Sequence, residues 1–165
     1  MTAGRPKGTK LDPENPSPVI LEVCEFDERG RVRLPPRITS EIEWFEIGAF
    51  ECLMVLDEPG RVILLPWNPY GEQVVKMRRE LIEEFSADST LRDTLSSLEY
   101  RYHRLPIPVD SRPYVGSLAL FHMDLPEGVP SRAYLIRFPE RLEIVSSSCR
   151  SQMSRKFLHQ FPDLS

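Results

Sequence analysis

The chain between residues 19 and 66 consists of short apolar runs separated by turn signals, a pattern typical of β-structure. Two turns are predicted at Asp27-Glu-Arg-Gly30 and Asp57-Glu-Pro-Gly60, because glycine supplies the positive φ that tight turns need. Ile38, Ile42 and Phe45 form one apolar stripe on a helix predicted over 36–46. The strands predicted around these features are 19–26, 31–34, 50–56 and 62–65.

The hydrophobic period changes after residue 67. Val74, Met77, Leu81 and Phe85 follow helical spacing and predict an amphipathic helix over 71–85. Asp88 or Ser89 is suited to cap a second helix that contains Leu91, Leu95 and Leu98. The charged sides of these helices mix both signs, which favours a solvated surface over a binding patch.

The second half of the chain repeats the order of the first. Arg33-Leu34-Pro35 returns as Arg104-Leu105-Pro106, and Arg61–Leu65 returns as Arg141–Val145. Between them we expect a short helix marked by Val109, Tyr114 and Leu118, then strands over 133–138 and 141–145. A terminal helix is predicted from Ser147 or Ser148, with Cys149, Met153, Phe157 and Phe161 on one stripe. This order indicates an internal duplication.

These elements predict an α+β fold that is mainly β, with accessory helices. Each half is too small to bury its apolar strands alone, so we expect pairing between halves or subunits. The predicted segments are an N-terminal arm (1–18), a first repeat (19–67), linking helices (68–99), a second, degenerate repeat (100–146) and a C-terminal helix (147–165).

Composition narrows the class of protein. The 165 residues are 41% hydrophobic and 28% charged, which suits one globular domain or two very small ones. No apolar run approaches the roughly 20 residues of a membrane-spanning helix, and residues 1–10 lack the apolar core of a secretory signal. The three cysteines, Cys24, Cys52 and Cys149, fit neither a disulfide framework nor a zinc pattern. We expect a cytoplasmic protein whose cysteines fill the core.

Charge is distributed unevenly, although the net value is only -4. Residues 11–28 hold six acidic and no basic side chains. Basic residues gather in two places, the arm with Arg5, Lys7 and Lys10, and the segment with Arg29, Arg31, Arg33 and Arg37. An acidic body with compact basic spots is compatible with DNA binding, because the potential near the phosphates matters more than the total charge.

Arg29, Arg31 and Arg33 have the spacing of a binding row. On a strand, alternate residues share one face about 7 Å apart, a repeat close to that of phosphates along DNA. A two-stranded ribbon can also enter the major groove, where arginine pairs with guanine. The alternative is an exposed strand whose arginines pair with Glu22, Glu25 or Asp27 on the neighbouring strand.

The segment Asp27-Glu-Arg-Gly-Arg-Val-Arg-Leu-Pro35, followed by a short helix and Val55–Pro66, resembles the AbrB/SpoVT superfamily. Two such units joined by helices resemble the MraZ family of bacterial transcriptional regulators. The resemblance implies tandem swapped-hairpin half-barrels in a cytoplasmic, nucleoid-associated homo-oligomer, often a ring, that binds double-stranded DNA. It places the DNA contact on Asp27, Gly30 and Arg31. The stretch aligned in the second half, Glu99–His103, lacks the Asp and Gly.

The arm adds a second candidate contact. Gly4-Arg-Pro-Lys-Gly8 resembles the core of an AT-hook, with Arg5 and Lys7 as its cations, and the alternative is a plain basic tail. A catalytic or metal site is not expected. His103, His122 and His159 are scattered, and phosphate-binding loops, dinucleotide-binding glycines and zinc-protease motifs are missing from the sequence.

The sequence therefore predicts a DNA-binding transcriptional regulator that is not an enzyme and needs no cofactor, no metal, no membrane and no small-molecule substrate. The alternative from another class is a protein–protein interaction or scaffolding barrel, antitoxin-like, that does not bind DNA. The acidic composition and the degenerate second hairpin favour that alternative.

Overall fold

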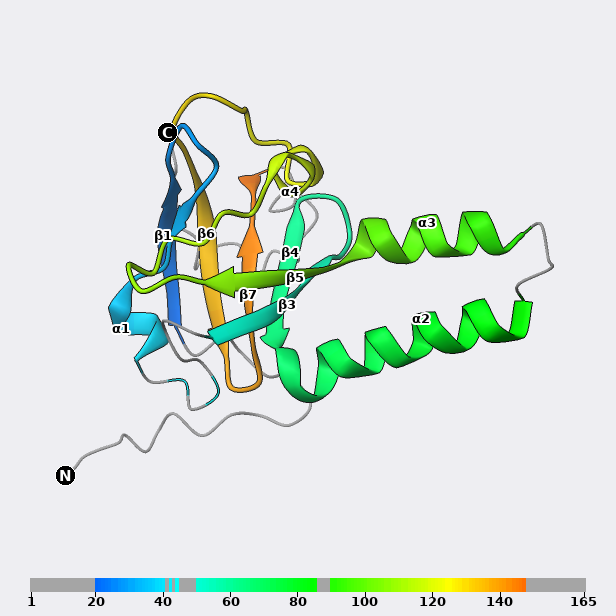
Figure 1. Cartoon of the computed structure of the whole chain (residues 1–165). Coiled ribbons are helices and arrows are strands. Elements are labelled where there is room, and N and C mark those ends of the chain that lie inside the picture. Colours follow the sequence, from blue (N-terminus) through cyan, green and yellow to red (C-terminus); the bar gives the residue numbers. More distant parts are fainter. Residues whose placement is uncertain (1–19, 41, 43, 45–49, 86–89, 148–165) are drawn as a thin grey trace, which may run out of the picture.

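The structure of the chain, a computed structural model, describes residues 20–40, 42, 44, 50–85 and 90–147. The fold is α+β and mainly β. Seven antiparallel strands form one sheet in the order β2-β1-β6-β7-β4-β3-β5, which curls into a half-barrel (Figure 1). The strands are β1 (Ile20–Phe26), β2 (Val32–Arg33), β3 (Phe50–Leu56), β4 (Arg61–Pro66), β5 (Tyr102–Ile107), β6 (Ser131–Phe138) and β7 (Arg141–Val145).

The helices are short except for one pair. That pair, α2 and α3, forms a hairpin that projects away from the sheet (Figure 1). The bounds are α1 (Pro36–Thr39), a π-helical turn η3 (Trp67–Gly71), α2 (Glu72–Phe85), α3 (Leu91–Arg101) and α4 (Ser117–His122). Among the described helices, none is long and apolar enough to cross a membrane.

The core lies on the concave side of the curled sheet, because strand residues alternate between its two faces. Phe26, Val32, Leu34 and Leu135 belong to the main cluster of buried side chains, together with Ile38 of α1 and Leu120 of α4. Tyr134 and Ile136 alternate with Leu135 along β6 and belong to a second cluster on the other face. β6 is thus buried on both faces, as a central strand of this sheet should be.

Most of the predicted strands are confirmed. β3 has the predicted bounds, and Cys52 to Leu56 are all buried, as its continuous apolar run requires. β1, β4, β6 and β7 match their predicted positions within two residues. The helix predicted over 71–85 is α2, and Leu91, Leu95 and Leu98 lie on α3, where the residue at the N-cap is Thr90. The terminal helix predicted from 147 lies almost entirely outside the described residues.

Two helices differ from the prediction. α1 covers only Pro36–Thr39, although Ile38 and Ile42 are buried as the stripe required. The helix expected around Val109 and Tyr114 begins only at Ser117, and those two side chains are exposed. Proline at position 113 removes a backbone donor, and Gly116, with φ of +90°, marks the start of α4 instead.

Two of the strand pairings repeat each other with a constant shift in residue number. Phe26 lies opposite Ser131 where β1 meets β6, and Phe50 lies opposite Ile107 where β3 meets β5. The shift from Phe26 to Ile107 is 81 residues, and so is the shift from Phe50 to Ser131. β5 therefore occupies the same place beside β3 that β1 occupies beside β6.

This register corrects one predicted equivalence. The sequence aligned Arg33 with Arg104, but Arg33 lies in β2 opposite Glu25, whereas Arg104 lies in β5 opposite Leu53. The counterpart of β5 in the first half is β1, so the turn equivalent to 27–30 lies after β5 and not before it. The short Arg-Leu-Pro match therefore does not mark equivalent positions, since Arg104–Pro106 lies within β5 and Arg33 lies in β2.

The helical hairpin is attached to the sheet through Trp67. The guanidinium of Arg104 on β5 lies over the Trp67 ring at 4.0 Å from its centroid, and also pairs with Glu51 at 3.1 Å. A β-carbon on Gly71 would lie only 2.1 Å from the Trp67 ring, so this position accommodates only glycine. The start of α2 is thereby held against β3 and β5.

Candidate nucleic-acid interface

The turn between β1 and β2 is held together by the carboxylate of Asp27. Its Oδ1 accepts hydrogen bonds from the backbone N–H groups of Arg29 (2.9 Å) and Arg31 (3.0 Å). Its Oδ2 accepts from Nε of Arg31 at 2.8 Å. The N–H of Arg31, together with its side chain and the N–H of Arg29, holds the pKa of Asp27 below its ordinary value of 3.8. The ionised carboxylate thus fixes both the turn and the direction of Arg31.

Gly30 makes this turn possible in two ways. Its φ of +82° is the left-handed conformation that glycine adopts without strain, and its N–H donates to the Asp27 carbonyl at 3.0 Å. A β-carbon here would also approach Leu120 of α4 to 3.2 Å. The turn residues Asp27 and Gly30, predicted from the motif, are therefore explained by backbone geometry and by packing on α4.

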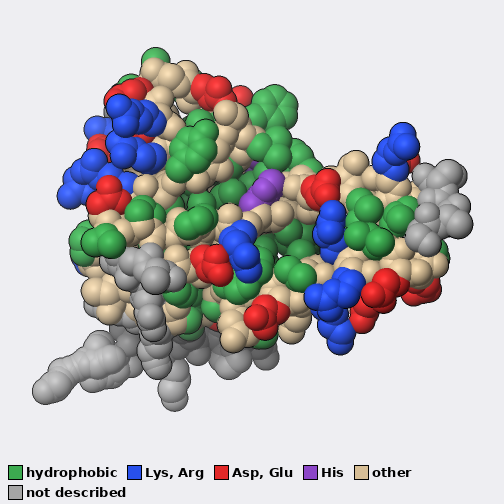
Figure 2. All heavy atoms as spheres, viewed as in Figure 1, with side chains coloured by type: hydrophobic (Ala, Val, Ile, Leu, Met, Phe, Trp, Pro, Cys, Tyr) green, Lys and Arg blue, Asp and Glu red, His purple; other side chains and the backbone are tan. Residues whose placement is uncertain are grey.

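Two arginine side chains flank a glutamate across three neighbouring strands beyond the turn. Arg33 on β2 and Arg132 on β6 both lie opposite Glu25 on the central strand β1, so all three share one face of the sheet. Arg33 and Arg132 are exposed. Basic side chains gather over this end of the sheet, with acidic ones between them (Figure 2). The carboxylate of Glu25 lies 3.6 Å from Nε of Arg132.

This face contains a recess of about 360 Å³. Four guanidinium groups line it, against two carboxylates, so its formal charge is positive although the protein as a whole is acidic. The residues around it are Glu25, Phe26, Asp27, Arg31, Arg33, Arg112, Pro130, Ser131 and Arg132. An anion that entered it would meet guanidinium donors from both halves of the chain.

The predicted arginines divide into two groups. Arg31 pairs with Asp27, as the surface-pair alternative expected, and Arg37, which that alternative did not include, pairs with Glu22 at 2.7 Å. Arg29 and Arg33 are exposed, and no side-chain partner is found for either among the described residues. Arg37 lies on α1, outside the lining of the recess. Arg5 and Lys7 lie outside the described residues.

Sequence reasoning missed two arginines of this recess, Arg112 and Arg132. Arg132 stands alone in a loop-to-strand junction and gives no motif signal. Arg112 follows Ser111, which has a φ of +61°. A search for an Asp-x-x-Gly turn passes over this segment, because serine takes the position of glycine. The sequence does contain one signal for this turn, because Pro108 and Asp110 are residue types common in turns and they directly follow a strand.

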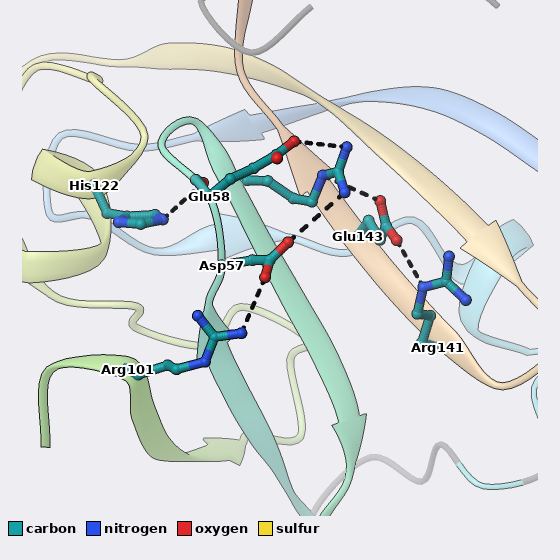
Figure 3. A network of polar contacts seen from close by, with 7 residues as sticks. Asp57, Glu58, Arg101, His122, Arg141 and Glu143 are labelled. Carbon is teal, nitrogen blue, oxygen red and sulfur yellow. Dashed lines mark hydrogen bonds and ion pairs between the residues drawn. The ribbon is translucent and has the colours of Figure 1, made fainter. Parts of the chain in front are cut away.

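A polar network fastens the β3–β4 turn to the second half (Figure 3). The buried carboxylate of Glu143 on β7 accepts from Nε of Arg141 at 2.6 Å and lies 3.6 Å from Nε of Arg61. Arg61 also pairs with Asp57 and Glu58 of the turn, and Arg101 of α3 donates to Asp57 at 3.1 Å. This network joins strands and a helix, and its charges are balanced internally, which suits a structural role.

His122 connects three elements through the hydrogen bonds of its ring. Its Nε2 lies 2.9 Å from the Glu58 carbonyl, and its Nδ1 lies 2.9 Å from the Tyr100 hydroxyl. Because a carbonyl only accepts, Nε2 must donate, and a neutral ring then accepts from Tyr100 at Nδ1. Within the described parts of the chain, no group of three His, Cys, Asp or Glu side chains is placed to hold a metal ion.

Neither a protein-family model nor a curated protein sequence matches this chain.

Proposed function

We propose that this protein is a DNA-binding transcriptional regulator of the MraZ/AbrB type, whose β1–β2 turn contacts the phosphate backbone. The observation that supports it is the recess in which Arg31 and Arg33 stand beside two further guanidinium groups. Contacts between arginine and phosphate supply affinity and fix the position of the protein on the duplex. Contacts between arginine and base edges in a groove determine which sequence is bound. Double-stranded DNA is the partner, and a cytoplasmic, nucleoid-associated location follows from it.

We further propose the tandem swapped-hairpin arrangement as the scaffold. The equal shift of 81 residues that relates β1 to β5 and β3 to β6 supports it, because each leading strand then pairs with the hairpin of the other half. Such an exchange explains why one chain of this length can bury strands that neither half could cover alone.

A homo-oligomer, including a ring, is part of the proposal because several weak contacts on one assembly bind DNA tightly. No described residue of α2 or α3 is buried, although Met77 and Phe85 are large apolar side chains. A second copy is the proposed occupant of this hairpin. Met77→Glu should reduce the native mass in sizing, whereas Val75→Glu, which adds the same charge to the opposite side of the same helix, should not. Equal masses for both variants and the parent would contradict this assignment.

The experiment for DNA binding measures affinity for labelled random-sequence duplexes over a range of salt concentrations. For the parent, log affinity should fall steeply with log salt, by about 0.9 per phosphate contact. The double variant Arg31→Ala/Arg33→Ala should lose most of the affinity and about two units of slope at unchanged oligomer size. Lys76→Ala/Arg92→Ala removes the same charge from the helical hairpin and is the matched control, provided that sizing gives it the native mass of the parent.

One observation favours the second candidate function, a protein–protein interaction or scaffolding barrel that does not bind DNA. Arg31 and Arg37 are already paired with Asp27 and Glu22, so part of the basic segment is neutralised within the chain. That function predicts no salt-dependent affinity for duplexes in the parent. It also predicts that Arg31→Ala/Arg33→Ala behaves like the Lys76→Ala/Arg92→Ala control.

A further inference from the structure

The second half of the chain contains a turn equivalent to the β1–β2 turn, and it lies at 108–111. The N–H of Ser111 donates to the Pro108 carbonyl at 3.0 Å, as the N–H of Gly30 donates to the Asp27 carbonyl at 3.0 Å. Ser111 and Gly30 both have positive φ, +61° and +82°. They are 81 residues apart, the same shift that relates β1 to β5.

This equivalence makes Arg112 the counterpart of Arg31. Each arginine directly follows the positive-φ residue of its turn. Pro108 takes the place of Asp27 in this turn, but Asp110 supplies a carboxylate from another position, since its Oδ1 accepts from the N–H of Arg112 at 3.1 Å. The side chains differ in one respect, because Arg31 is tied to a carboxylate, whereas no ion pair of Arg112 is found among the described residues.

The two segments that follow these turns pair with each other. The N–H groups of Val32 and Leu34 donate to the carbonyls of Pro113 (3.0 Å) and Ser111 (3.1 Å). The N–H of Val115 donates to the Gly30 carbonyl at 3.2 Å, and Arg31 lies opposite Tyr114. This antiparallel contact brings the two turns side by side, so that Arg31 and Arg112 line the same recess.

Electrostatics of the recess favour the second-half arginines as ligand contacts. Glu25 and Asp27 are its only carboxylates, and Asp27 is occupied by Arg31 and two backbone N–H groups. The Glu25–Arg132 pair is long, at 3.6 Å, and both side chains are more than half exposed, so it contributes little. Arg112, Arg33 and Arg132 therefore keep donors available for an incoming anion.

We infer that the DNA-binding face is composite, with Arg112 and Arg132 of the second half as further contacts to duplex phosphates. This inference rests on the proposed function and extends the same site. The local antiparallel contact around Val32 and Pro113 presents one arginine from each turn, Arg31 and Arg112, as an approximately two-fold pair. Such a pair suits the two backbones that border a groove.

The test compares single variants in the same salt titration with labelled random-sequence duplexes. Arg112→Ala and Arg132→Ala should each lower the slope by about one and weaken binding severalfold. Arg112→Lys should keep the salt slope of the parent, because counterion release follows the charge, and it should weaken binding less than Arg112→Ala does. Arg92→Ala on the helical hairpin is the single-charge control, sizing verifies that its native mass equals that of the parent, and circular dichroism verifies that each variant is folded.

The outcomes separate this inference from the function on which it rests. If the parent binds duplexes and the Arg31→Ala/Arg33→Ala variant does not, while Arg112→Ala and Arg132→Ala bind like the parent, the composite face is wrong and the proposed function stands. If the parent shows no salt-dependent binding, the composite face and the proposed function are both wrong.

A second experiment measures by calorimetry the binding of inorganic phosphate at constant ionic strength. Phosphate binding that depends on Arg112, with duplex binding that does not, would assign the recess to a free anion and overturn the inference.

Discussion

The N–H of Val32 donates a hydrogen bond of 3.0 Å to the carbonyl of Pro113, and this bond joins the two halves of the chain at their closest turn segments. Val32 is fully buried. β2 spans only Val32–Arg33, which lie opposite Phe26 and Glu25 of β1 on one side, while the N–H groups of Val32 and Leu34 donate to residues 111–113 on the other. The strand predicted over 31–34 is therefore shorter than its alternating pattern suggested.

The interlocked halves should fold together and not separately. Residues 1–88 alone would leave β1 without β6, β3 without β5 and β4 without β7. We expect this fragment and its complement 89–165 each to be unfolded by circular dichroism, and their mixture to recover the β signal. In the intact chain, fluorescence of Trp44 and Trp67 and far-ultraviolet dichroism should give coincident urea transitions. A fragment that folds alone, or two separated transitions, would contradict the shared sheet.

The strand pattern was predictable because local signals and burial agree there. Leu53 to Leu56 form a continuous apolar run between turn residues, and β3 is buried over that run. The α1 and α4 helices were predicted poorly, because Ile42 is buried without being helical and Val109 is apolar without being buried. In both segments tertiary contacts and the restrictions of proline and glycine override the apolar spacing.

The candidate site was predictable only in part, for a similar reason. Asp27, Gly30 and Arg31 form a local motif whose bonds span five residues, so the sequence displays it directly. Arg112 and Arg132 reach the same recess through pairing across 77 or more residues, which no local pattern encodes. The register of β5 was needed to find them.

The buried carboxylate of Glu143 should matter more for stability than its exposed neighbour Glu140, although both pair with Arg141. The Glu143 side chain is 6% exposed and the Glu140 side chain 59%. Glu143→Gln removes the negative charge and replaces one of the two buried carboxylate oxygens facing Arg141 and Arg61 by an N–H donor, and it should lower the free energy of unfolding by about 1–3 kcal/mol. Glu140→Gln should change it by about 0–1 kcal/mol. Urea unfolding measures the effect of each variant, and equal effects would show that the network around Glu143 does not stabilise the fold.

The carboxylate of Asp27 should make the stability of the fold sensitive to acid. Its pKa in the folded chain lies below the ordinary value of 3.8, so the unfolded chain binds the proton more readily. The stabilisation is therefore complete above pH 3.8 and is lost as the pH falls through the lower folded pKa. Asp27→Asn should unfold at lower urea concentration near neutral pH and should show a smaller further loss on acidification.

The matched control for this pH experiment is Glu28→Gln, one residue along the same turn. Glu28 is exposed, and no hydrogen bond from its side chain is found in the part of the chain that the structure describes. Its pH profile of stability should follow that of the parent. If Asp27→Asn also followed the parent profile, the ionised carboxylate would not be what holds the turn.

The two described cysteines should be unreactive in the folded protein. Cys24 and Cys52 are 1% and 0% exposed, and burial raises the pKa of each thiol to about 12. The thiolate is the reactive form, so both access and ionisation oppose attack by a disulfide reagent at pH 8. In a Cys149→Ser background, we expect no rapid thiol reaction until urea unfolds the chain, when both thiols should react. Adding Ser97→Cys on the exposed surface of α3 supplies the positive control, with one thiol that reacts at once. Rapid modification without that added cysteine would show that β1 or β3 opens in the native state.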